Sequence, residues 1–538
     1  MGRAKVVNYY NERFCGNMSA EQCDILEHLI ELDAENGSVC DLTHIIYDLD
    51  DADVLSIIED YELFNCAMHE YNMKRGRLLN YQTVAVCFMY WANRCILGDS
   101  VGMGKTVATA GVCNLIKANM ADQGRTHRYL VLTEKNLAVQ FRNEMVKFTG
   151  EFVQLLPDGE ARSINKFKSR NPFDCVLEHS VVGTHSLLTV GGFISWLELC
   201  RTSGCGFPFD TLIIDESSDI GVKSTTQMAT SFKNLSKYFR NIYFLNATPF
   251  ETHLNVFYNQ LNLLDPYLLP TKQNFEKTYC IMNYRGMYAR PTGKYKNQEQ
   301  FKGLIRYRYF ARTRKDKGAK MSDCKGGVVY SVLSKVQQDL LRKSQLHRMV
   351  YDCPSHIDPS IEFNSTNVPK LASLENLLKC ECSEADTIII FVQFKEAQKQ
   401  LSQWLTNKGY PNRVLNGDTP NDKRQAIIQG FKNCEFRVLL TNIQKGLNFG
   451  NCDYCIFYSF DPNPSHMVQF EGRITRDFDI TGKNIYIMCS LGKEKETLQK
   501  VVASRAKATT QFTNTDYSVI LDILLKRGIG NNDSDTEE

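Results

Sequence analysis

The feature that most constrains the fold is a repeated alternation between short runs rich in Val, Ile and Leu and stretches whose apolar residues have helical spacing. The first half of the chain contains the runs RYLVLT, SVVGT, DTLIID and RNIYFLNA, and the second half contains DTIIIFVQF, FRVLLTN, CDYCIFYSF and KNIYIMCSL. Such runs, separated by helices, are typical of strands buried on both faces of a parallel sheet. Because 538 residues exceed what one core accommodates, the sequence predicts an α/β fold with two tandem parallel-sheet lobes.

Changes in charge and pattern divide the chain into four expected domains. Residues 14–73 hold no Lys or Arg but 15 Asp or Glu, which predicts a small acidic helical region. We therefore expect an acidic N-terminal region at 1–75, a first lobe at 76–325 that ends in a basic connector, a second lobe at 326–510, and a C-terminal helix with an acidic disordered tail at 511–538.

The charge of the central body favours a polyanionic partner. Residues 74–529 hold 60 basic and 41 acidic residues, although the whole chain has a net charge of only +2. The segment 284–325 alone holds 13 basic and 3 acidic residues with tyrosines between them, which fits either a contact with duplex DNA or a structural linker between the lobes. The acidic N-terminal region is expected to cover a basic cleft, to bind a protein partner, or simply to pack against the first lobe.

The stretch GDSVGMGKT at 98–106 resembles a phosphate-binding loop with one displaced glycine. The usual pattern G-x-x-x-x-G-K-[ST] would place its first glycine at position 99, where this chain has Asp99. A predicted strand precedes the loop and a predicted helix follows it, which is the context that the motif requires. Backbone amides near Gly102 and Gly104 can then surround phosphate oxygens, while Lys105 reaches the β- and γ-phosphates.

A second motif, DTLIIDESS, ends a buried strand with two adjacent carboxylates. Asp215 at a strand tip can hold Mg²⁺ together with Thr106 of the loop, and Glu216 can polarise an attacking water. An acidic helix start would also explain the pair, but the two motifs together favour hydrolysis of ATP with Mg²⁺. We expect Lys105, Asp215 and Glu216 to be catalytic.

A third motif, QFEGRITRDFD, lies in the second lobe. Gln469, Arg473 and Arg476 have the spacing Q-x-x-x-R-x-x-R, so that the two arginines share one face of a helix. Guanidinium groups that enter a phosphate site stabilise the charge on the transferred phosphoryl group, which makes both arginines catalytic candidates. The alternative is an ordinary surface helix with two arginines.

With these motifs in order, the chain resembles the Swi/Snf-type DNA-dependent ATPases of helicase superfamily two. LLNYQ resembles the entry motif of that family, whose glutamine, here Gln82, reads adenine, and the family typically has Asp six places before the loop Lys, as Asp99 stands here. VVGTHSLL, LNATPFETHLNVFYNQLNLLDP, RYFARTRKDK, NGDTPNDKRQAIIQGF and LLTNIQKGLNFGNCDYCIFYSFDPNP follow in family order. The resemblance implies RecA-like lobes, and residue roles in three groups.

The residues expected to bind ATP are Gln82, Asp99, Gly102, Met103, Gly104, Lys105, Thr106 and Gln469. Those expected to couple hydrolysis to movement are Ala247, Thr248 and Gly446. Those expected to contact the nucleic-acid backbone are Thr133, Thr184, Thr441 and Asn442.

The chain also departs from the family pattern. Ser217 and Ser218 replace the Ala and His of D-E-A-H. In the family that His couples the motif to the next one, so this chain lacks the residue that usually does so. Ile443, Gln444 and Lys445 stand in place of A-G-G. The absence of large insertions or chromatin-reading segments predicts a compact motor of the bacterial or large-virus kind.

The expected function is an ATP-dependent motor that translocates mainly on duplex DNA. Two alternatives remain open: a strand-separating or branch-migrating helicase in replication, repair or transcription, and a scaffold whose ATPase has decayed. A strand-separating hairpin could lie within residues 281–300. The lack of a membrane-length apolar run or signal peptide predicts an intracellular protein, in the cytoplasm of a bacterium or an infected host cell.

The 19 cysteines predict a reducing compartment rather than a disulfide framework. Cys452 and Cys455 have C-x-x-C spacing, and Cys380 and Cys382 have C-x-C spacing. A zinc site normally needs two such pairs as its four ligands. The context NCDYCIFY favours small buried residues on the approach to a strand over a metal or redox site.

Overall fold

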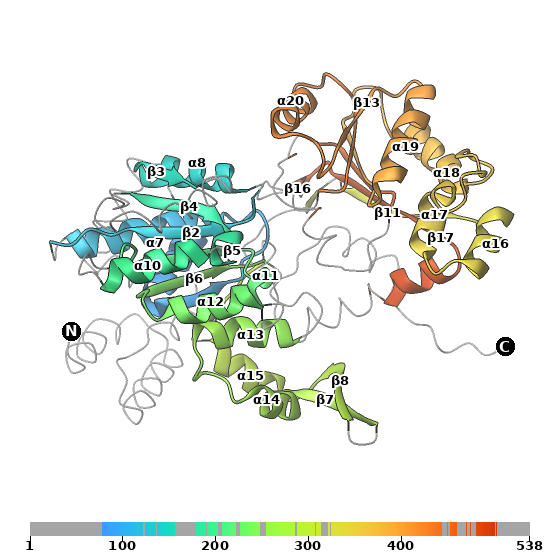
Figure 1. Ribbon diagram of the computed structural model, residues 1–538. Helices are drawn as coiled ribbons and strands as arrows, with labels where there is room; N and C mark the ends of the chain where they lie inside the picture. The colour runs from blue at the N-terminus through green and yellow to red at the C-terminus, as the bar shows by residue number, and fades with distance from the viewer. Residues whose placement is uncertain are drawn as a thin grey trace. The chain divides into compact units, whose positions relative to one another are not determined.

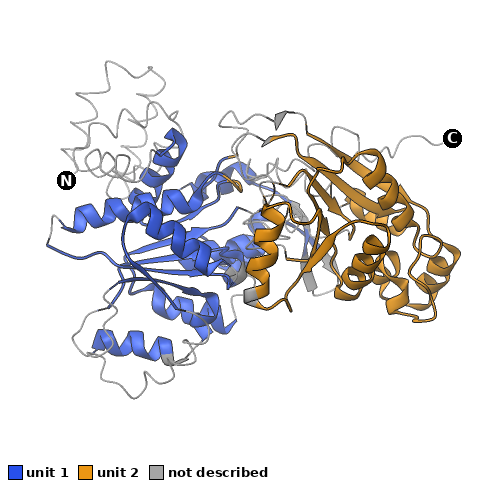
Figure 2. Cartoon of the chain, turned by 90° about the horizontal axis from the view of Figure 1, so that it is seen from above, with its two compact units in different colours: residues 1–99, 103–312 blue, residues 100–102, 313–538 orange. Residues whose placement is uncertain are grey.

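A computed structural model divides the chain into two compact units, residues 1–99 with 103–312 and residues 100–102 with 313–538 (Figure 2). The predicted acidic N-terminal region and the C-terminal helix and tail lie outside the described residues. The structure describes residues 78–121, 124–135, 137–156, 179–189, 191–202, 207–221, 226–247, 254–285, 288–306, 308–313, 321–322, 324–443, 449, 452–459, 470, 474, 480–500 and 502.

The first unit is built on a seven-stranded sheet with the order β3-β4-β2-β5-β6-β1-β9. Every neighbouring pair in it is parallel, which confirms the α/β prediction for this lobe. Its strands are β1 (Arg94–Leu97), β2 (Tyr129–Thr133), β3 (Val153–Leu155), β4 (Ser180–Thr184), β5 (Thr211–Asp215), β6 (Asn241–Leu245) and β9 (Tyr309–Phe310).

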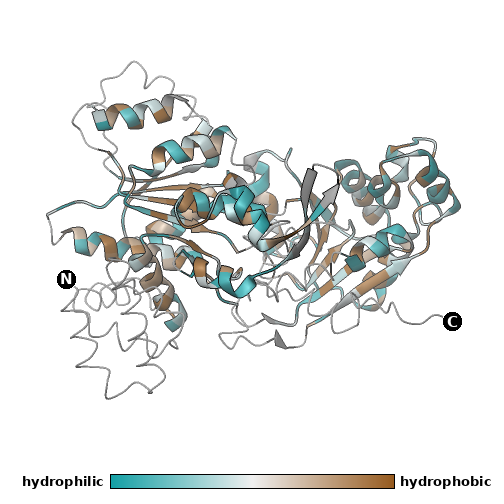
Figure 3. Cartoon of the chain, turned by 90° about the horizontal axis from the view of Figure 1, so that it is seen from below, coloured by the Kyte–Doolittle hydropathy of each residue, from teal (hydrophilic) through white to brown (hydrophobic). Residues whose placement is uncertain are grey.

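Helices with both polar and apolar residues cover both faces of this sheet, whose strands are mostly brown in Figure 3. On one face, α6 (Asn80–Ala92), α7 (Lys105–Ala121) and α8 (Ala138–Thr149) share a core with alternate strand residues such as Val131 and Ile213. The opposite face includes the contact between the rings of Phe232 and Phe244. Further helical elements of this lobe are η3 (His185–Thr189), α10 (Gly191–Thr202), α11 (Ser218–Gly221), α12 (Gln227–Ser236) and α13 (Leu254–Leu264).

A small aromatic cluster attaches an antiparallel hairpin to the first unit. The hairpin consists of β7 (Cys280–Arg285) and β8 (Tyr288–Tyr295), and it lies between α14 (Lys272–Tyr279) and α15 (Gln298–Ile305) in the sequence. The rings of Phe275, Tyr279 and Phe301 contact one another, and those of Phe257 and Phe301 meet edge to face. Figure 1 shows the hairpin beside α14 and apart from the sheet.

The second unit contains a six-stranded sheet with the order β11-β17-β15-β12-β14-β13, again parallel throughout. Ile389 and Phe391 face one core and Ile388 and Ile390 the other, so that both faces of β12 are buried. This sheet confirms the second parallel-sheet lobe. Its strands are β11 (Lys325–Ser331), β12 (Ile388–Phe391), β13 (Asn412–Leu415), β14 (Val438–Thr441), β15 (Tyr454–Phe457) and β17 (Asn484–Ser490).

Helices cover the second sheet as they do the first. Leu374 of α18 (Pro369–Cys380) and Leu401 of α19 (Lys395–Asn407) belong to the core on the Ile388 side, and Phe431 of α20 (Asn421–Lys432) to the core on the Ile389 side. The other elements are the short pair β10 (Met321–Ser322) with β16 (Ile480–Thr481), α16 (Lys335–Lys343), α17 (His347–Asp352) and η5 (Pro354–His356). Among the described residues, no helix is both long and apolar enough to cross a membrane.

Candidate active site

The parallel register of the first sheet aligns the carboxyl ends of its central strands. Asp215 is level with Leu245, and Leu97 is level with Leu245 on the other side of β6. Thr133 lies beside Thr184 at the ends of β2 and β4. Ligands of open α/β sheets bind at this edge, and here the glycine-rich loop, Asp215 and Glu216 all emerge from it.

The glycine-rich loop turns directly into α7, which begins at Lys105. Gly102 has φ of 87° and Gly104 has φ of 80°, a left-handed conformation that favours glycine. A Cβ atom added at Gly104 would lie 2.5 Å from Nε2 of Gln82, so a larger residue there would displace the end of that side chain. The arrangement places the first amides of α7 at the loop, where the N-terminus of a helix suits a phosphate group.

Gln82, the predicted adenine reader, uses both ends of its amide within the protein. Its Oε1 accepts a hydrogen bond from the backbone N–H of Leu79 at 3.0 Å, and its Nε2 donates to the carbonyl oxygen of Met103 at 3.1 Å. The side chain therefore ties the start of α6 to the phosphate loop. The contact with adenine remains a prediction.

Lys105 is partly exposed, and its amine folds back across the loop. Its Nζ donates to the carbonyl oxygen of Asp99 at 2.6 Å. Thr106, the predicted Mg²⁺ ligand of the loop, is also partly exposed. Met103, which lies between β1 and Lys105 in the sequence, is buried.

Asp99 is engaged by an arginine that the sequence motifs did not single out. Its Oδ2 accepts from Nη2 of Arg312 at 2.6 Å, and its Oδ1 accepts from the backbone N–H and Nε of the same residue. Arg312 also donates to the carbonyl oxygen of Tyr81 and lies over the ring of Phe310 at 4.5 Å. Asp99 thus has a structural partner, and its predicted contact with ATP stays a prediction.

The displaced glycine of the loop has a steric reason. A Cβ atom at Gly98 would lie 2.6 Å from the ring of Tyr309 and 2.8 Å from Cβ of Ala311. The backbone N–H of Gly98 donates to the carbonyl oxygen of Phe310, which extends the pairing of β1 with β9. β9 and the residues directly after it therefore explain why position 98 is a glycine and position 99 an aspartate.

Asp215 is oriented by two neighbours at the carboxyl edge. Its Oδ2 accepts a hydrogen bond from the hydroxyl of Thr133 at 3.0 Å, and its carbonyl oxygen accepts from Nε2 of His185 at 2.8 Å. Both neighbours are buried. Thr133 is predicted to contact the nucleic-acid backbone, and the structure adds a bond to the carboxylate that is predicted to hold Mg²⁺.

Glu216 is the acidic residue best suited to act on a water molecule. Its backbone has φ of 49°, which is uncommon for a residue other than glycine and typical of functional sites. Its Oε2 is buried and has no hydrogen-bond partner among the described residues. A buried carboxylate oxygen without a protein partner fits a site that is completed by water and ligand.

The two serines after Glu216 differ in their contacts. The Ser217 hydroxyl donates to Oε1 of Gln260 at 2.7 Å, and the same oxygen accepts from Nδ2 of Asn246 at 3.2 Å. The Ser218 hydroxyl is buried and has no hydrogen-bond partner among the described residues. Gln260 on α13 is the second functional candidate that sequence reasoning missed, because it lies inside the quoted segment LNATPFETHLNVFYNQLNLLDP but the family resemblance assigned it no role.

The predicted nucleic-acid residues use their side chains within the protein. The Thr184 hydroxyl is 2.6 Å from that of Ser186, and the Thr441 hydroxyl accepts from the backbone N–H of Ile443. Asn442 donates to the carbonyl oxygen of Gln393 at 3.3 Å. Their contacts with a nucleic-acid strand stay predictions.

Several predicted residues cannot be compared with the structure. Ala247 follows β6 and is buried. Five predicted residues lie outside the described part of the chain: the coupling residues Thr248 and Gly446, the ATP-binding Gln469, and the catalytic arginines Arg473 and Arg476.

The cysteine pairs do not form a cluster of metal ligands in the described part of the chain. Cys452 and Cys455 are fully buried beside or within β15, and burial raises the pKa of the Cys452 thiol to about 12. The Cys452 thiol donates to the carbonyl oxygens of Thr387 and Tyr454. These contacts are those of small buried residues.

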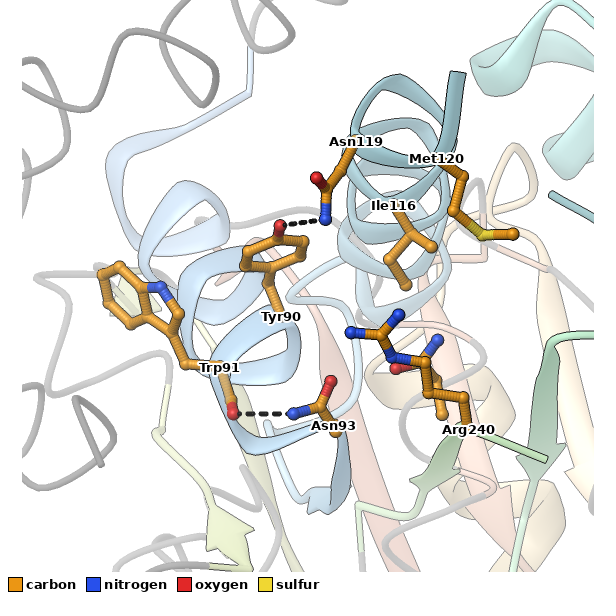
Figure 4. A pocket seen from close by; sticks show the side chains of 8 residues that line it. Tyr90, Trp91, Asn93, Ile116, Asn119, Met120 and Arg240 are labelled. Carbon is orange, nitrogen blue, oxygen red and sulfur yellow. Dashed lines mark hydrogen bonds between the residues drawn. The ribbon is translucent and has the colours of Figure 1, made fainter. Parts of the chain in front are cut away.

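A pocket of the first unit lies away from the aligned carboxyl ends (Figure 4). It opens at the amino ends of β1 and β6, with a cavity of about 190 Å³. The Tyr90 hydroxyl accepts a hydrogen bond from Nδ2 of Asn119 at its wall. None of the predicted site residues is among its lining residues, which are Tyr90, Trp91, Asn93, Ile116, Asn119, Met120, Arg240 and Asn241.

Known proteins resemble this chain over most of its length. A mouse protein named chromodomain-helicase-DNA-binding protein 1-like is 22% identical over 83% of this chain and 51% of its own length. The Arabidopsis thaliana protein named ATP-dependent DNA helicase DDM1 is 21% identical over 74% of this chain and 57% of its own length. The chain thus spans about half the length of the curated relatives it matches.

Among solved structures, the Sulfolobus solfataricus SWI2/SNF2 ATPase core in complex with dsDNA aligns with 82% of this chain and 93% of its own. The sequence identity is 18% and the TM-score is 0.37.

Two protein families match the two lobes. The helicase conserved C-terminal domain matches residues 369–477. The SNF2-related domain matches residues 81–411, which is more than half of the chain. The glycine-rich loop, Asp215 and Glu216 all lie within this match, and the chain belongs to the SNF2-related family.

Proposed function

We propose that this protein is an ATP-driven motor that hydrolyses ATP and translocates on duplex DNA without separating its strands. Membership of the SNF2-related family supports the proposal, as do the DNA-related names of its relatives. The excess of basic residues between positions 74 and 529 also supports a polyanionic track.

One observation carries the ATPase assignment. At the carboxyl edge of the first sheet, β1 ends level with Asp215 and leads through the glycine-rich loop to Lys105, and Glu216 follows Asp215 with a carboxylate oxygen that has no hydrogen-bond partner among the described residues. A cation, a metal-binding carboxylate and a free base at the end of one sheet are the groups that phosphoryl transfer to water requires. This set also argues against a decayed scaffold.

The residues present fit ATP with Mg²⁺. The described part of the chain lacks a cluster of three His, Cys, Asp or Glu that could hold a metal by itself. Mg²⁺ usually takes only one or two protein carboxylates and completes its shell with phosphates and water, so Thr106 and Asp215 are sufficient protein ligands. When bound, the ion would neutralise charge on the phosphates and polarise them.

The chain's own groups then divide the work. The amides from Gly102 to Thr106 bind phosphate oxygens, and Lys105 leaves the carbonyl of Asp99 for the terminal phosphate. The Thr133 hydroxyl donates to Oδ2 of Asp215 and so orients the carboxylate that would hold the ion directly or through its water. Glu216 orients the attacking water and accepts its proton at Oε2. Arg473 and Arg476 remain predicted contributors to the same phosphates.

The test is the rate of ATP hydrolysis with duplex DNA, single-stranded DNA, RNA or no nucleic acid. We expect duplex DNA to stimulate hydrolysis most. Lys105→Ala and Glu216→Gln should each lower the stimulated kcat by at least about 100-fold, since each removes a group that acts on the transferred phosphate or the water.

Lys117→Ala is the matched control, because Lys117 lies on the same helix and pairs with Glu151 at the surface. Its rate should equal that of the wild type. A wild-type rate that no nucleic acid changes would refute the motor assignment.

A strand-separating helicase is the second candidate, because the structure contains the hairpin that such an activity could use. β7 and β8 pair antiparallel from Cys280 with Tyr295 to Arg285 with Tyr288. Arg285, Arg290 and Lys294 give the hairpin positive charge without an acidic residue between 280 and 295. A projecting basic hairpin can wedge between strands or contact a duplex.

Fork unwinding by a shortened hairpin distinguishes the two candidates. Replacing residues 284–289 with Asn-Gly keeps the pairing of Asn283 with Arg290 and closes it with a two-residue turn. A helicase should lose unwinding of a forked duplex but keep DNA-stimulated hydrolysis of ATP. A duplex translocase should show no fork unwinding in either form and should displace a triplex-forming strand.

Three finer expectations stay proposals. The bacterial or large-virus kind of motor rests on the sequence alone, and the relatives named above come from a mouse and a plant. The intracellular reducing location, in the cytoplasm of a bacterium or an infected cell, rests on composition. A protein partner for the acidic N-terminal region is proposed from its charge, and oligomeric state remains outside the proposal.

A further inference from the structure

The ends of β5 and β6 are joined by a buried hydrogen-bond relay through α13. Oε1 of Gln260 accepts from the Ser217 hydroxyl at 2.7 Å and from Nδ2 of Asn246 at 3.2 Å. Ser217 and Gln260 are fully buried, and Asn246 is 1% exposed. Ser217 directly follows Glu216, and Asn246 directly precedes Ala247 of the predicted coupling segment.

Each group of the relay is constrained by the others. Two donors converge on one oxygen, so a movement of α13 that removed Gln260 would break two buried hydrogen bonds at once. The backbone strengthens the same connection, because the N–H of Ser217 is 3.4 Å from the carbonyl oxygen of Leu245 and the N–H of Asn246 donates to that of Leu97.

We propose that Gln260 is a positioning residue that transmits movement between Asn246 directly after β6 and the Glu216 carboxylate. This inference rests on the proposed ATPase function. Glu216 has φ of 49°, a conformation that persists only where its surroundings hold it. The Ser217 bond provides that support one residue away. When Asn246 shifts, the shared oxygen of Gln260 moves Ser217 and with it the base that orients water.

The relay also gives a physical reason for one of the two serines in D-E-S-S. An alanine at position 217 has no donor to offer, whereas the serine supplies the hydroxyl that Gln260 accepts. The pair Ser217 and Gln260 therefore connects hydrolysis to the next segment in this chain by a route through α13.

The test is a double-mutant cycle on DNA-stimulated hydrolysis of ATP. Gln260→Met keeps the length of the side chain and removes the shared acceptor. We expect it to lower the DNA-stimulated kcat about tenfold, as a barrier change equal to one lost buried hydrogen bond would do, while KM for ATP changes less than about twofold.

Ser217→Ala should also slow the stimulated rate, and the double variant should be no slower than Gln260→Met alone, because both changes break the same relay. Effects that multiply in the double variant would overturn the proposal. A Gln260→Met enzyme that DNA stimulates as strongly as the wild type would overturn it too.

Gln337→Met is the matched control for lost stability. Gln337 is a buried glutamine of the second unit, and its Nε2 donates to the carbonyl oxygens of Val350 and Tyr351. We expect it to lower the melting temperature as Gln260→Met does but to keep DNA stimulation. If both variants lose DNA stimulation, the effect of Gln260→Met is explained by lost stability, and the positioning role of Gln260 is wrong. A wild-type enzyme without stimulation would instead refute the proposed function itself.

Discussion

Asp99 and Arg312 show how a single residue at the phosphate loop depends on a partner 213 positions away. Both side chains are nearly buried, and Arg312 meets both carboxylate oxygens. A bidentate pair in a buried setting holds its two segments in a defined geometry. The pair therefore anchors the loop to the strand β9 that closes the first sheet.

Removing the arginine should destabilise the first unit. Arg312→Met leaves the Asp99 carboxylate buried and without its cation, which costs about 3 to 5 kcal/mol of the free energy of unfolding. Denaturant unfolding followed by hydrogen exchange in β1 and β2 measures the loss. Arg308→Met is the control, because the pair of Arg308 with Asp265 is more exposed and should contribute about 1 kcal/mol or less.

A second variant tests the structural role of the pair of Asp99 with Arg312. Asp99→Leu combined with Arg312→Met removes both buried charges, so it should be more stable than Arg312→Met alone. If Arg312→Met unfolds at the same denaturant concentration as the wild type, the anchoring role of the pair is wrong.

At the scale of elements, a buried lysine joins four parts of the second unit. Lys370 at the start of α18 contacts Asp352 at the end of α17, Glu494 after β17, and the carbonyl oxygen of Tyr458 after β15. Burial alone would lower the pKa of the Lys370 amine, but the two carboxylates beside it raise that pKa above its usual range. The charged amine is thus what allows two buried carboxylates to lie together.

Loss of this amine should be more damaging than loss of a surface lysine. Lys370→Met leaves Asp352 and Glu494 without their shared cation, and we expect a loss of about 3 to 5 kcal/mol in the free energy of unfolding of the second unit. Lys379→Met on the same helix breaks an exposed pair with Glu375 and should change the free energy of unfolding far less, because water screens that pair. Equal melting temperatures for the two variants would contradict the role assigned to Lys370.

At the scale of the whole molecule, each unit has its own core, and the first carries a pH-sensitive group. Burial, with a smaller effect of Lys117, lowers the pKa of His127 to about 4. Its Nε2 lies 2.9 Å from the hydroxyl of Thr211 at the start of β5. In the unfolded chain a histidine has a pKa of about 6.5, so the unfolded state binds more protons between these two values.

The first unit should therefore lose stability as the pH falls from about 6.5 towards 4. The contribution of neutral His127 is complete above pH 6.5 and amounts to at most roughly 3 kcal/mol. Hydrogen exchange of β2 and β5 amides at pH 7.5 and pH 5 measures it against β12 and β14 of the second unit. His127→Phe should reduce the loss of protection of the β2 and β5 amides between pH 7.5 and pH 5. If the variant has the same pH dependence as the wild type, His127 is not the pH-sensitive group.

The sequence by itself determined the class of fold and the local motifs. Apolar runs with intervening helices predicted two parallel sheets. The motifs that contain Lys105, Asp215 and Glu216 predicted the phosphate site, because the carboxyl ends of parallel strands share one edge. These properties depend on neighbours along the chain, which a reader of the sequence can see.

Only the tertiary structure decided which distant side chains complete the motifs. Arg312 for Asp99 and Gln260 for Ser217 come from the residues after β9 and from α13, and although both lie in motif segments, nothing local says which distant side chain each will meet. Buried polar groups must find partners, but many folds of the intervening chain would satisfy that demand with other residues. The choice is made when strand order and helix packing bring particular side chains within hydrogen-bond distance.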